Sequence, residues 1–141
     1  MPLPKDVLGK KLTIDRKAAA QQQIDMAWRL MKESEFACAI TLALAAEERL
    51  PDTDKPHVLK SLRQKAPQEM EMFNQVRNWL KHDKPPDEIE IFEFEVALAL
   101  MRAVSKFRAV YGQASAPMDA FVEWTREKGL LRPKDASALN P

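Results

Sequence analysis

Apolar positions recur every three or four residues along most of the chain, which is the spacing of one face of an α-helix. In residues 93–111, for example, Val96, Leu100, Ala103 and Phe107 form one apolar stripe. Proline costs about 3 kcal/mol inside a helix, and none of the ten prolines lies within residues 5–50 or 87–116. The pattern therefore predicts five helical elements, over residues 15–32, 34–50, 56–82 (broken near Pro67), 93–111 and 117–128.

The residues that flank these elements fit helix ends. Ser34 is a candidate N-cap for the second element, because its hydroxyl could accept a hydrogen bond from a free backbone N–H. Gly112 and Gly129 each follow an apolar run, where a left-handed residue would end the helix. Residues 88–91 instead alternate with period two, as a strand does. Since a lone strand has no partner elsewhere in the sequence, we expect residues 88–91 to form an extended lead-in to the fourth helix.

These elements predict an all-α protein, an up-and-down bundle of about five helices. The length of 141 residues corresponds to a single domain. We expect residues 14–130 to form the helical domain and residues 1–13 to be an N-terminal extension. The polar residues 131–141 are expected to be a flexible C-terminal tail.

Composition and charge exclude several classes of protein. The 22 Lys and Arg residues against 21 Asp and Glu give a formal charge of +1, which excludes a strongly basic protein that binds nucleic acid by bulk phosphate neutralisation. Cys38 is the sole cysteine, so an intrachain disulfide and a cysteine-rich zinc site are excluded, and we expect Cys38 to be a small core residue. The sequence contains no apolar run of signal-peptide or membrane-spanning length, which leads us to expect a cytoplasmic protein without membrane contact.

Cofactor and metal sites are not indicated. The chain has three glycines and no glycine-rich phosphate loop, which excludes P-loop and Rossmann sites. Its two histidines lack the spacing of metal ligands. His57, which follows Pro56, is expected at the surface or at a helix cap.

The segment 72–82 separates into an apolar and a polar face on a helical wheel. The polar side chains are Asn74, Arg77, Asn78, Lys81 and His82. Arginine can hold a phosphate through several planar donors, and histidine can exchange a proton near neutral pH, so these residue types suit a phosphodiester-cleaving site. The simpler interpretation is a solvent-exposed face whose cations favour the C-terminal end of the helix dipole.

Residues 77–82, Arg-Asn-Trp-Leu-Lys-His, fit the R-x(4–6)-H motif of the HEPN superfamily. The wider segment 73–82 and the Ala-rich, Glu-terminated residues 39–48 also resemble bacterial HEPN-like proteins, and the resemblance covers about residues 36–108. It implies a helical homodimer in which the motifs of two subunits form a metal-independent ribonuclease site. Such enzymes are frequent in toxin–antitoxin and phage-defence systems.

Carried over by position, the resemblance assigns a role to each polar residue. Arg77 would bind the scissile phosphate, His82 would act as general acid or base, and Asn78 would hold the polar position beside the arginine. Asn74 and Lys81 would support RNA binding. The RNA 2′-hydroxyl would attack the adjacent phosphate, so DNA would not be cut. The expected partners are RNA, a second copy of the chain and an antitoxin or nucleotidyltransferase.

Two alternatives to an active enzyme stay open. One is a catalytically silent helical dimer that binds a partner protein or a nucleotide, and the other is a structural helical dimer with no site. If the two copies of the 77–82 stripe face each other in a cleft, the enzyme is favoured.

Glu47 falls on the apolar side of the second predicted helix. A carboxylate there is costly unless it is paired. We consider two possibilities. Glu47 pairs with Arg77 or His82 across the bundle, as a third group of the site, or the helix frays before Pro51 and Glu47 reaches solvent.

Overall fold

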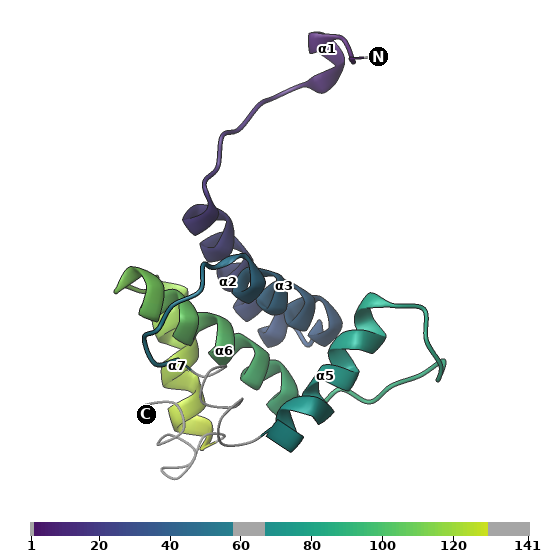
Figure 1. The fold of residues 1–141 in the computed structure, drawn as a ribbon, viewed down its shortest axis with the longest axis vertical. Coiled ribbons are helices and arrows are strands. Elements are labelled where there is room, and N and C mark those ends of the chain that lie inside the picture. Colours follow the sequence, from purple (N-terminus) through teal and green to yellow (C-terminus); the bar gives the residue numbers. More distant parts are fainter. Residues whose placement is uncertain (1, 58–66, 130–141) are drawn as a thin grey trace.

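Helices α2 (Arg16–Lys32) and α3 (Phe36–Arg49) fold back on each other at the centre of the molecule. α6 (Glu93–Tyr111) packs against both, and α7 (Ala116–Lys128) packs against α2 and α6. In Figure 1 these four helices form one layered bundle. They correspond to four of the five predicted elements, and the α6 bounds coincide with the predicted 93–111.

The remaining described helices lie outside this bundle. The computed structural model describes residues 2–57 and 67–129, and contains no strand within them. α5 (Pro67–Lys81) lies on the flank of the bundle and packs mainly against α3 (Figure 1). α1 (Lys5–Leu8) is a single turn that the sequence pattern did not predict. The predicted all-α class is confirmed for the described residues.

Small side chains allow the central helices to approach closely. Ala20 and Ala27 of α2 are fully buried, as are Ala46 of α3 and the two α6 alanines Ala99 and Ala103. Aromatic residues fill the remaining volume at the α7 side, where the Trp28 and Phe121 rings lie 5.5 Å apart in an edge-to-face arrangement. Since these residues come from α2, α3, α6 and α7, the described bundle has one continuous core.

The turn between α2 and α3 differs from the prediction. Ser34 does not cap α3. It ends α2 in the left-handed conformation, with φ of 63°. The N–H groups of Ser34 and Glu35 donate to the carbonyls of Met31 and Leu30 at 3.0 and 2.9 Å, which is the Schellman arrangement. The turn needs a left-handed residue between the two helices, and this requirement overrides the capping preference of serine.

The other predicted helix ends are confirmed where the structure describes them. Gly112 and Gly129 are left-handed and follow α6 and α7. The Asp15 carboxylate accepts a hydrogen bond from the Ala18 N–H at 2.8 Å and caps α2. Residues 88–91 belong to no helix or strand and lead into α6.

Two predictions about burial are wrong. Cys38 is exposed, because the buried face of α3 runs through its neighbours Ala39 and Ile40. His57 is buried, so its expected place at the surface is wrong, whereas a helix cap there would involve residues 58–66, which lie outside the described residues.

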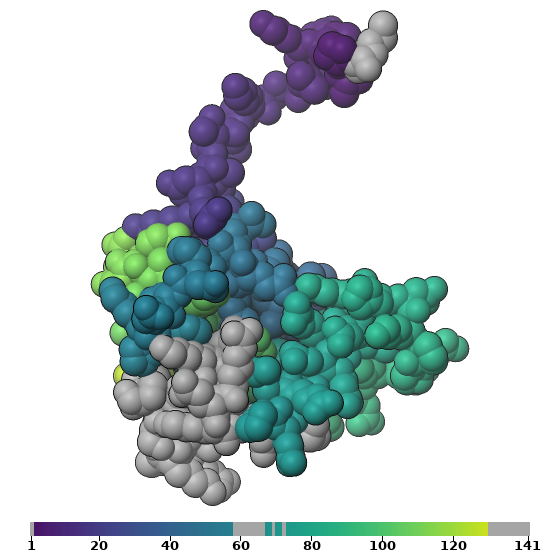
Figure 2. Space-filling view, in the orientation of Figure 1, coloured from purple at the N-terminus to yellow at the C-terminus, as the bar shows by residue number. Residues whose placement is uncertain are grey.

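The two ends of the chain contrast with the bundle. Residues 2–14 are all exposed and stand clear of the body in Figures 1 and 2. The tail predicted for residues 131–141 lies outside the described residues, as does the part of the third predicted element in residues 58–66. Within the described ranges, no helix is both long and apolar enough to cross a membrane.

Candidate functional site

The polar side chains predicted for the site lie along α5 and just past its end. The Arg77 side chain is 31% exposed and that of Lys81 is 42% exposed. Asn78 and His82 are exposed, and Asn74 is half-buried. On the opposite side of α5, Phe73 and Val76 are buried against the core. The predicted division into an apolar and a polar face is therefore confirmed for these residues.

Glu48 of α3 joins two of these cations. Its carboxylate accepts a hydrogen bond from Arg77 Nη2, and Lys81 Nζ lies 3.2 and 3.4 Å from its two oxygens. The Arg77 Nε is buried and has no hydrogen-bond partner among the described residues. The guanidinium is thus held from one side by a carboxylate that is itself partly exposed.

Glu47, predicted to pair with Arg77 or His82 or to reach solvent, does neither. It is buried and forms a two-point ion pair with Arg102 of α6, at 2.8 and 3.1 Å. Lys106 Nζ also donates to the Glu47 carbonyl at 3.2 Å. Consecutive helix residues point about 100° apart, so Glu47 faces α6 while Glu48 faces α5. Glu47 therefore belongs to the core of the bundle and not to the candidate site.

The end of α5 is tied down by backbone and indole hydrogen bonds. The His82 N–H donates to the Asn78 carbonyl at 3.0 Å, which continues the helical bonding one residue past Lys81. Trp79 is half-buried, and its Nε1 donates to the Pro86 carbonyl at 2.7 Å. These contacts fix the backbone on both sides of His82, while its imidazole is exposed.

A surface hollow of about 470 Å³ extends the site on the α3 side. Glu48 is part of its wall, together with Arg16 and Arg49. Asp52 and the loop residues Leu50 and Pro51 complete the lining. Arg77 and Lys81 contact Glu48, whereas Arg16 and Arg49 share the hollow with Glu48 and with a second acid, Asp52. Sequence analysis missed Glu48, Arg16 and Arg49, and the only signal for Glu48 was its place in the Glu-Glu pair that ends the segment 39–48.

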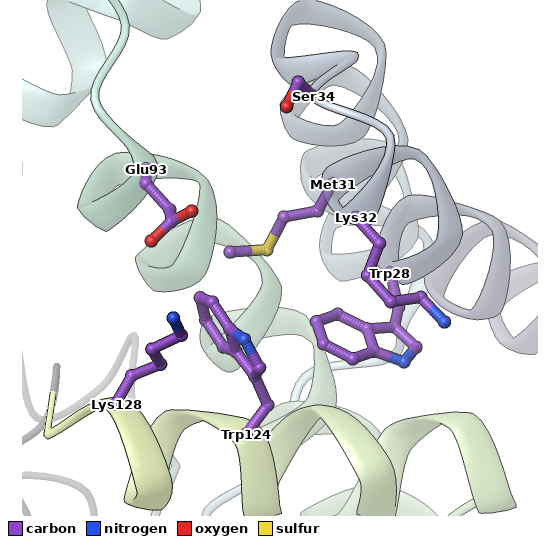
Figure 3. A pocket seen from close by; sticks show the side chains of 7 residues that line it. All are labelled: Trp28, Met31, Lys32, Ser34, Glu93, Trp124 and Lys128. Atoms are coloured by element: carbon purple, nitrogen blue, oxygen red, sulfur yellow. The ribbon is translucent and has the colours of Figure 1, made fainter.

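A second, smaller pocket lies at the other end of the bundle, between α2, α6 and α7 (Figure 3). It has a volume of about 200 Å³ and is lined by Trp28, Met31, Lys32, Ser34, Glu93, Trp124 and Lys128. Figure 3 shows the Met31 side chain and the two indole rings converging on it. Small-molecule sites usually occupy about 300–1,000 Å³, so this pocket is below the size of a typical ligand site.

The described residues contain no group of three or more His, Cys, Asp and Glu side chains placed to hold a metal ion. No known protein-family model matches the chain, and no curated protein or solved structure is similar to it. The chemistry of the site therefore rests on its own residues.

Proposed function

We propose that this protein is a metal-independent endoribonuclease of the HEPN type, with Arg77 and His82 as the residues that act on the scissile phosphate. The observation that carries the proposal is the contact of Arg77 and Lys81 with Glu48, together with the exposed His82 that directly follows Lys81 at the end of α5. Arg16 and Arg49 line the adjoining hollow with Glu48 and Asp52, so the four cations exceed the two acids by two. Clustered cations attract a polyanion, and they can bind successive phosphates along a single RNA strand.

Each residue has a distinct role in the proposed reaction. A general base takes the proton from the 2′-hydroxyl, the 2′ oxygen forms a bond to the adjacent phosphorus, and the bond from phosphorus to the 5′ oxygen breaks. The leaving 5′ oxygen receives a proton from a general acid. His82 performs one of the two proton transfers, since imidazole is suited to both near neutral pH. Arg77 stabilises the charge on the phosphoryl oxygens through its planar donors.

In this proposal the Glu48 carboxylate competes with RNA for the same cations. Its carboxylate neutralises part of the charge of Arg77 and Lys81, so a phosphate must compete with it for the same donors. Lys81, Asn78 and Asn74 lie on the same face of α5 and offer further polar contacts to the strand. Glu47 is excluded from the proposed site because it is buried against Arg102.

The proposed active form is a homodimer. Arg77 and His82 are five residues apart, which is about 7.5 Å along a helix, and they do not lie directly above one another. A two-fold axis beside α5 would bring His82 of one copy toward Arg77 of its partner and double the number of cations at the phosphate. A role in a toxin–antitoxin or phage-defence system, with an antitoxin or nucleotidyltransferase partner, belongs to the same proposal.

The test is cleavage of a labelled structured RNA and of its DNA counterpart, both in the presence of EDTA. We expect the wild-type protein to cut only the RNA and to leave a 2′,3′-cyclic phosphate and a 5′-hydroxyl. His82→Ala and Arg77→Ala should each reduce the rate by at least about 100-fold, as for loss of a general acid or of a charge-stabilising donor. Lys84→Ala is the matched control, because Lys84 is an exposed cation two residues past His82.

Two results would contradict the proposal. One is RNA cleavage that persists in both the His82 and the Arg77 variant, since the activity would then belong to another site or to a contaminant. The other is no cleavage by a folded wild-type dimer, which would favour the catalytically silent helical dimer. Circular dichroism of each variant confirms that the helices are intact.

A further inference from the structure

The N-terminal arm, residues 2–14, carries large aliphatic side chains that are exposed to solvent. Leu3, Val7, Leu8 and Leu12 are each more than 60% exposed, and Ile14 is 49% exposed. The arm also holds three lysines, at positions 5, 10 and 11, and one acid, Asp6, which gives it a net charge of +2. A soluble monomer rarely leaves so many neighbouring aliphatic side chains in water, so the arm has the character of one half of an interface.

The acidic segment, residues 87–95, has the opposite character. It contains five acids, Asp87, Glu88, Glu90, Glu93 and Glu95, and no Lys or Arg, so its net charge is −5. Phe92 and Phe94 are 61% and 47% exposed. Residues 88–91 belong to no helix or strand, and no backbone hydrogen bond joins them to another described residue. Ile89 and Ile91 pack partly against the core, whereas Glu88 and Glu90 are exposed. A backbone without hydrogen bonds among the described residues can pair with a segment of another chain.

We propose that the N-terminal arm of one copy binds the acidic segment of a second copy, and that two copies exchange arms around a two-fold axis. The two segments are complementary in charge, both carry exposed apolar side chains, and both include stretches outside helices and strands, at residues 9–14 and 88–92. The arm supplies the partner that the strand-like alternation of residues 88–91 lacks within its own chain. This inference does not depend on ribonuclease activity.

The position of the arm favours a second copy over the same chain. The start of α2 lies beside the end of α6, since Lys17 Nζ is 5.3 Å from the centre of the Tyr111 ring. The acidic segment lies at the other end of α6, about 28 Å away for a helix of 19 residues. In Figure 1 the arm extends away from that end. The six residues 9–14, between α1 and α2, span at most about 20 Å, so Lys10 and Lys11 are too close to the start of α2 to reach the acidic segment of their own chain.

The small pocket in Figure 3 adjoins the acidic segment, because Glu93 belongs to both. The indole rings of Trp28 and Trp124 form part of its wall, and its volume of about 200 Å³ is closer to one side chain than to a nucleotide. An aliphatic side chain of the incoming arm therefore has an apolar surface to cover next to the acidic residues.

Charge reversal tests the contact in the full-length chain. We expect sedimentation velocity to show a dimer that weakens as salt is raised. Lys10→Glu/Lys11→Glu and Glu88→Lys/Glu90→Lys should each raise the dissociation constant roughly tenfold, and the quadruple variant should restore dimerisation. Glu123→Lys/Glu127→Lys is the matched control, because both residues are exposed on α7 and the charge change is the same. A monomer at all concentrations, or a dimer insensitive to these reversals, would overturn the proposal.

Disulfide trapping distinguishes exchange between copies from docking within one chain. In a Cys38→Ser background, Leu12→Cys and Phe92→Cys are placed in separate chains, which are mixed and oxidised, because both positions are more than 60% exposed. A covalent heterodimer is expected from the mixture and not from either chain alone. When both cysteines are in one chain, an intramolecular disulfide as the main product would mean that the arm folds back on its own acidic segment, and the exchange would be wrong.

Discussion

Glu47 and Glu48 are neighbours in the sequence, yet they lie in two different environments. The Glu47 carboxylate is 4% exposed and is held by the two-point contact with Arg102. The Glu48 carboxylate is 46% exposed and faces Arg77 and Lys81. The first pair lies inside the α3–α6 contact, whereas the second lies at the surface between α3 and α5.

The difference shows how burial separates a structural ion pair from one that can exchange partners. Taking two charges out of water costs free energy. When a buried pair loses one member, the remaining charge is buried without compensation and strongly destabilises the folded state. An exposed pair is screened by water, and either member can turn to a ligand at little cost. The same residue type therefore supports the core at position 47 and forms exposed ion pairs that a ligand could displace at position 48.

Removal of the buried carboxylate should give the largest effect on stability. Glu47→Ala leaves Arg102 buried without its partner, and we expect the free energy of unfolding to fall by about 3–5 kcal/mol in urea denaturation. Nη1 of Arg102 already has no hydrogen-bond partner among the described residues, so the loss of Glu47 would leave Nε and Nη2 without their acceptor as well.

The control replaces both charges. Glu47→Leu/Arg102→Met removes the pair and keeps an apolar contact with Phe73, whose ring lies 5.0 Å from the Arg102 guanidinium. This double variant should recover most of the lost stability, since apolar residues of similar volume often substitute for buried ion pairs. A single variant that loses less than about 1 kcal/mol would mean that burial does not distinguish the two glutamates.

At the exposed position the effect should fall on binding instead of stability. Glu48→Gln should change the free energy of unfolding by less than about 1 kcal/mol, as for other exposed ion pairs. It should also tighten RNA binding, measured by fluorescence anisotropy, because Arg77 and Lys81 lose a competing carboxylate. Glu33→Gln is the matched control, since Glu33 is an exposed partner of Arg29 on another part of the surface. Equal gains in affinity for both variants would show only a general effect of net charge.

Glu95 lies between these two cases and should give the smallest effect. Its carboxylate is half-buried, Oε2 has no hydrogen-bond partner among the described residues, and burial raises its pKa despite a hydrogen bond from the Phe92 backbone. The folded state therefore holds the proton more tightly than the unfolded state, and stability falls as the pH rises from about 4.5 through the raised pKa. Glu95→Gln should be slightly more stable than wild type at pH 7.

The pH series provides the check for Glu95. Thermal unfolding from pH 4 to pH 7 should show a smaller decline in stability for Glu95→Gln than for the wild-type protein, with the two curves converging at the acidic end. A variant less stable than wild type at pH 7 would mean that the charge favours the start of α6 through the helix dipole by more than its burial costs.

Local patterns were sufficient for most of the described helices. Residues 93–111 combine a regular apolar stripe with a terminal glycine, and the structure places α6 at those residues. The polar face of α5 was also predictable, because it depends only on helical spacing. In contrast, the role of Ser34 depended on the turn that α3 requires in order to fold back on α2, which no window of the sequence contains.

The ion-pair partners of the charged residues could not be predicted from local sequence patterns. Arg102 and Lys106 lie on an apolar-looking stretch of α6, and their match with Glu47 appears only when α3 and α6 are in contact. Arg16 and Arg49 join the candidate site because the start of α2 and the end of α3 meet. The sequence could identify which helix carries the candidate chemistry, but the groups that surround it are set by tertiary packing.

Because α5 is attached to only one side of the bundle, the free energy needed to open the candidate site can differ from that needed to unfold the bundle. α5 packs mainly against α3, whereas α3 is also packed against α2 and α6. Segments with few neighbours open at a lower free energy than the core does. Detachment of α5 would separate Arg77 from Glu48 and leave the Glu47–Arg102 pair in place. The candidate site could then assemble and disassemble as a local equilibrium, coupled to RNA by mass action, while the remaining helices stay folded.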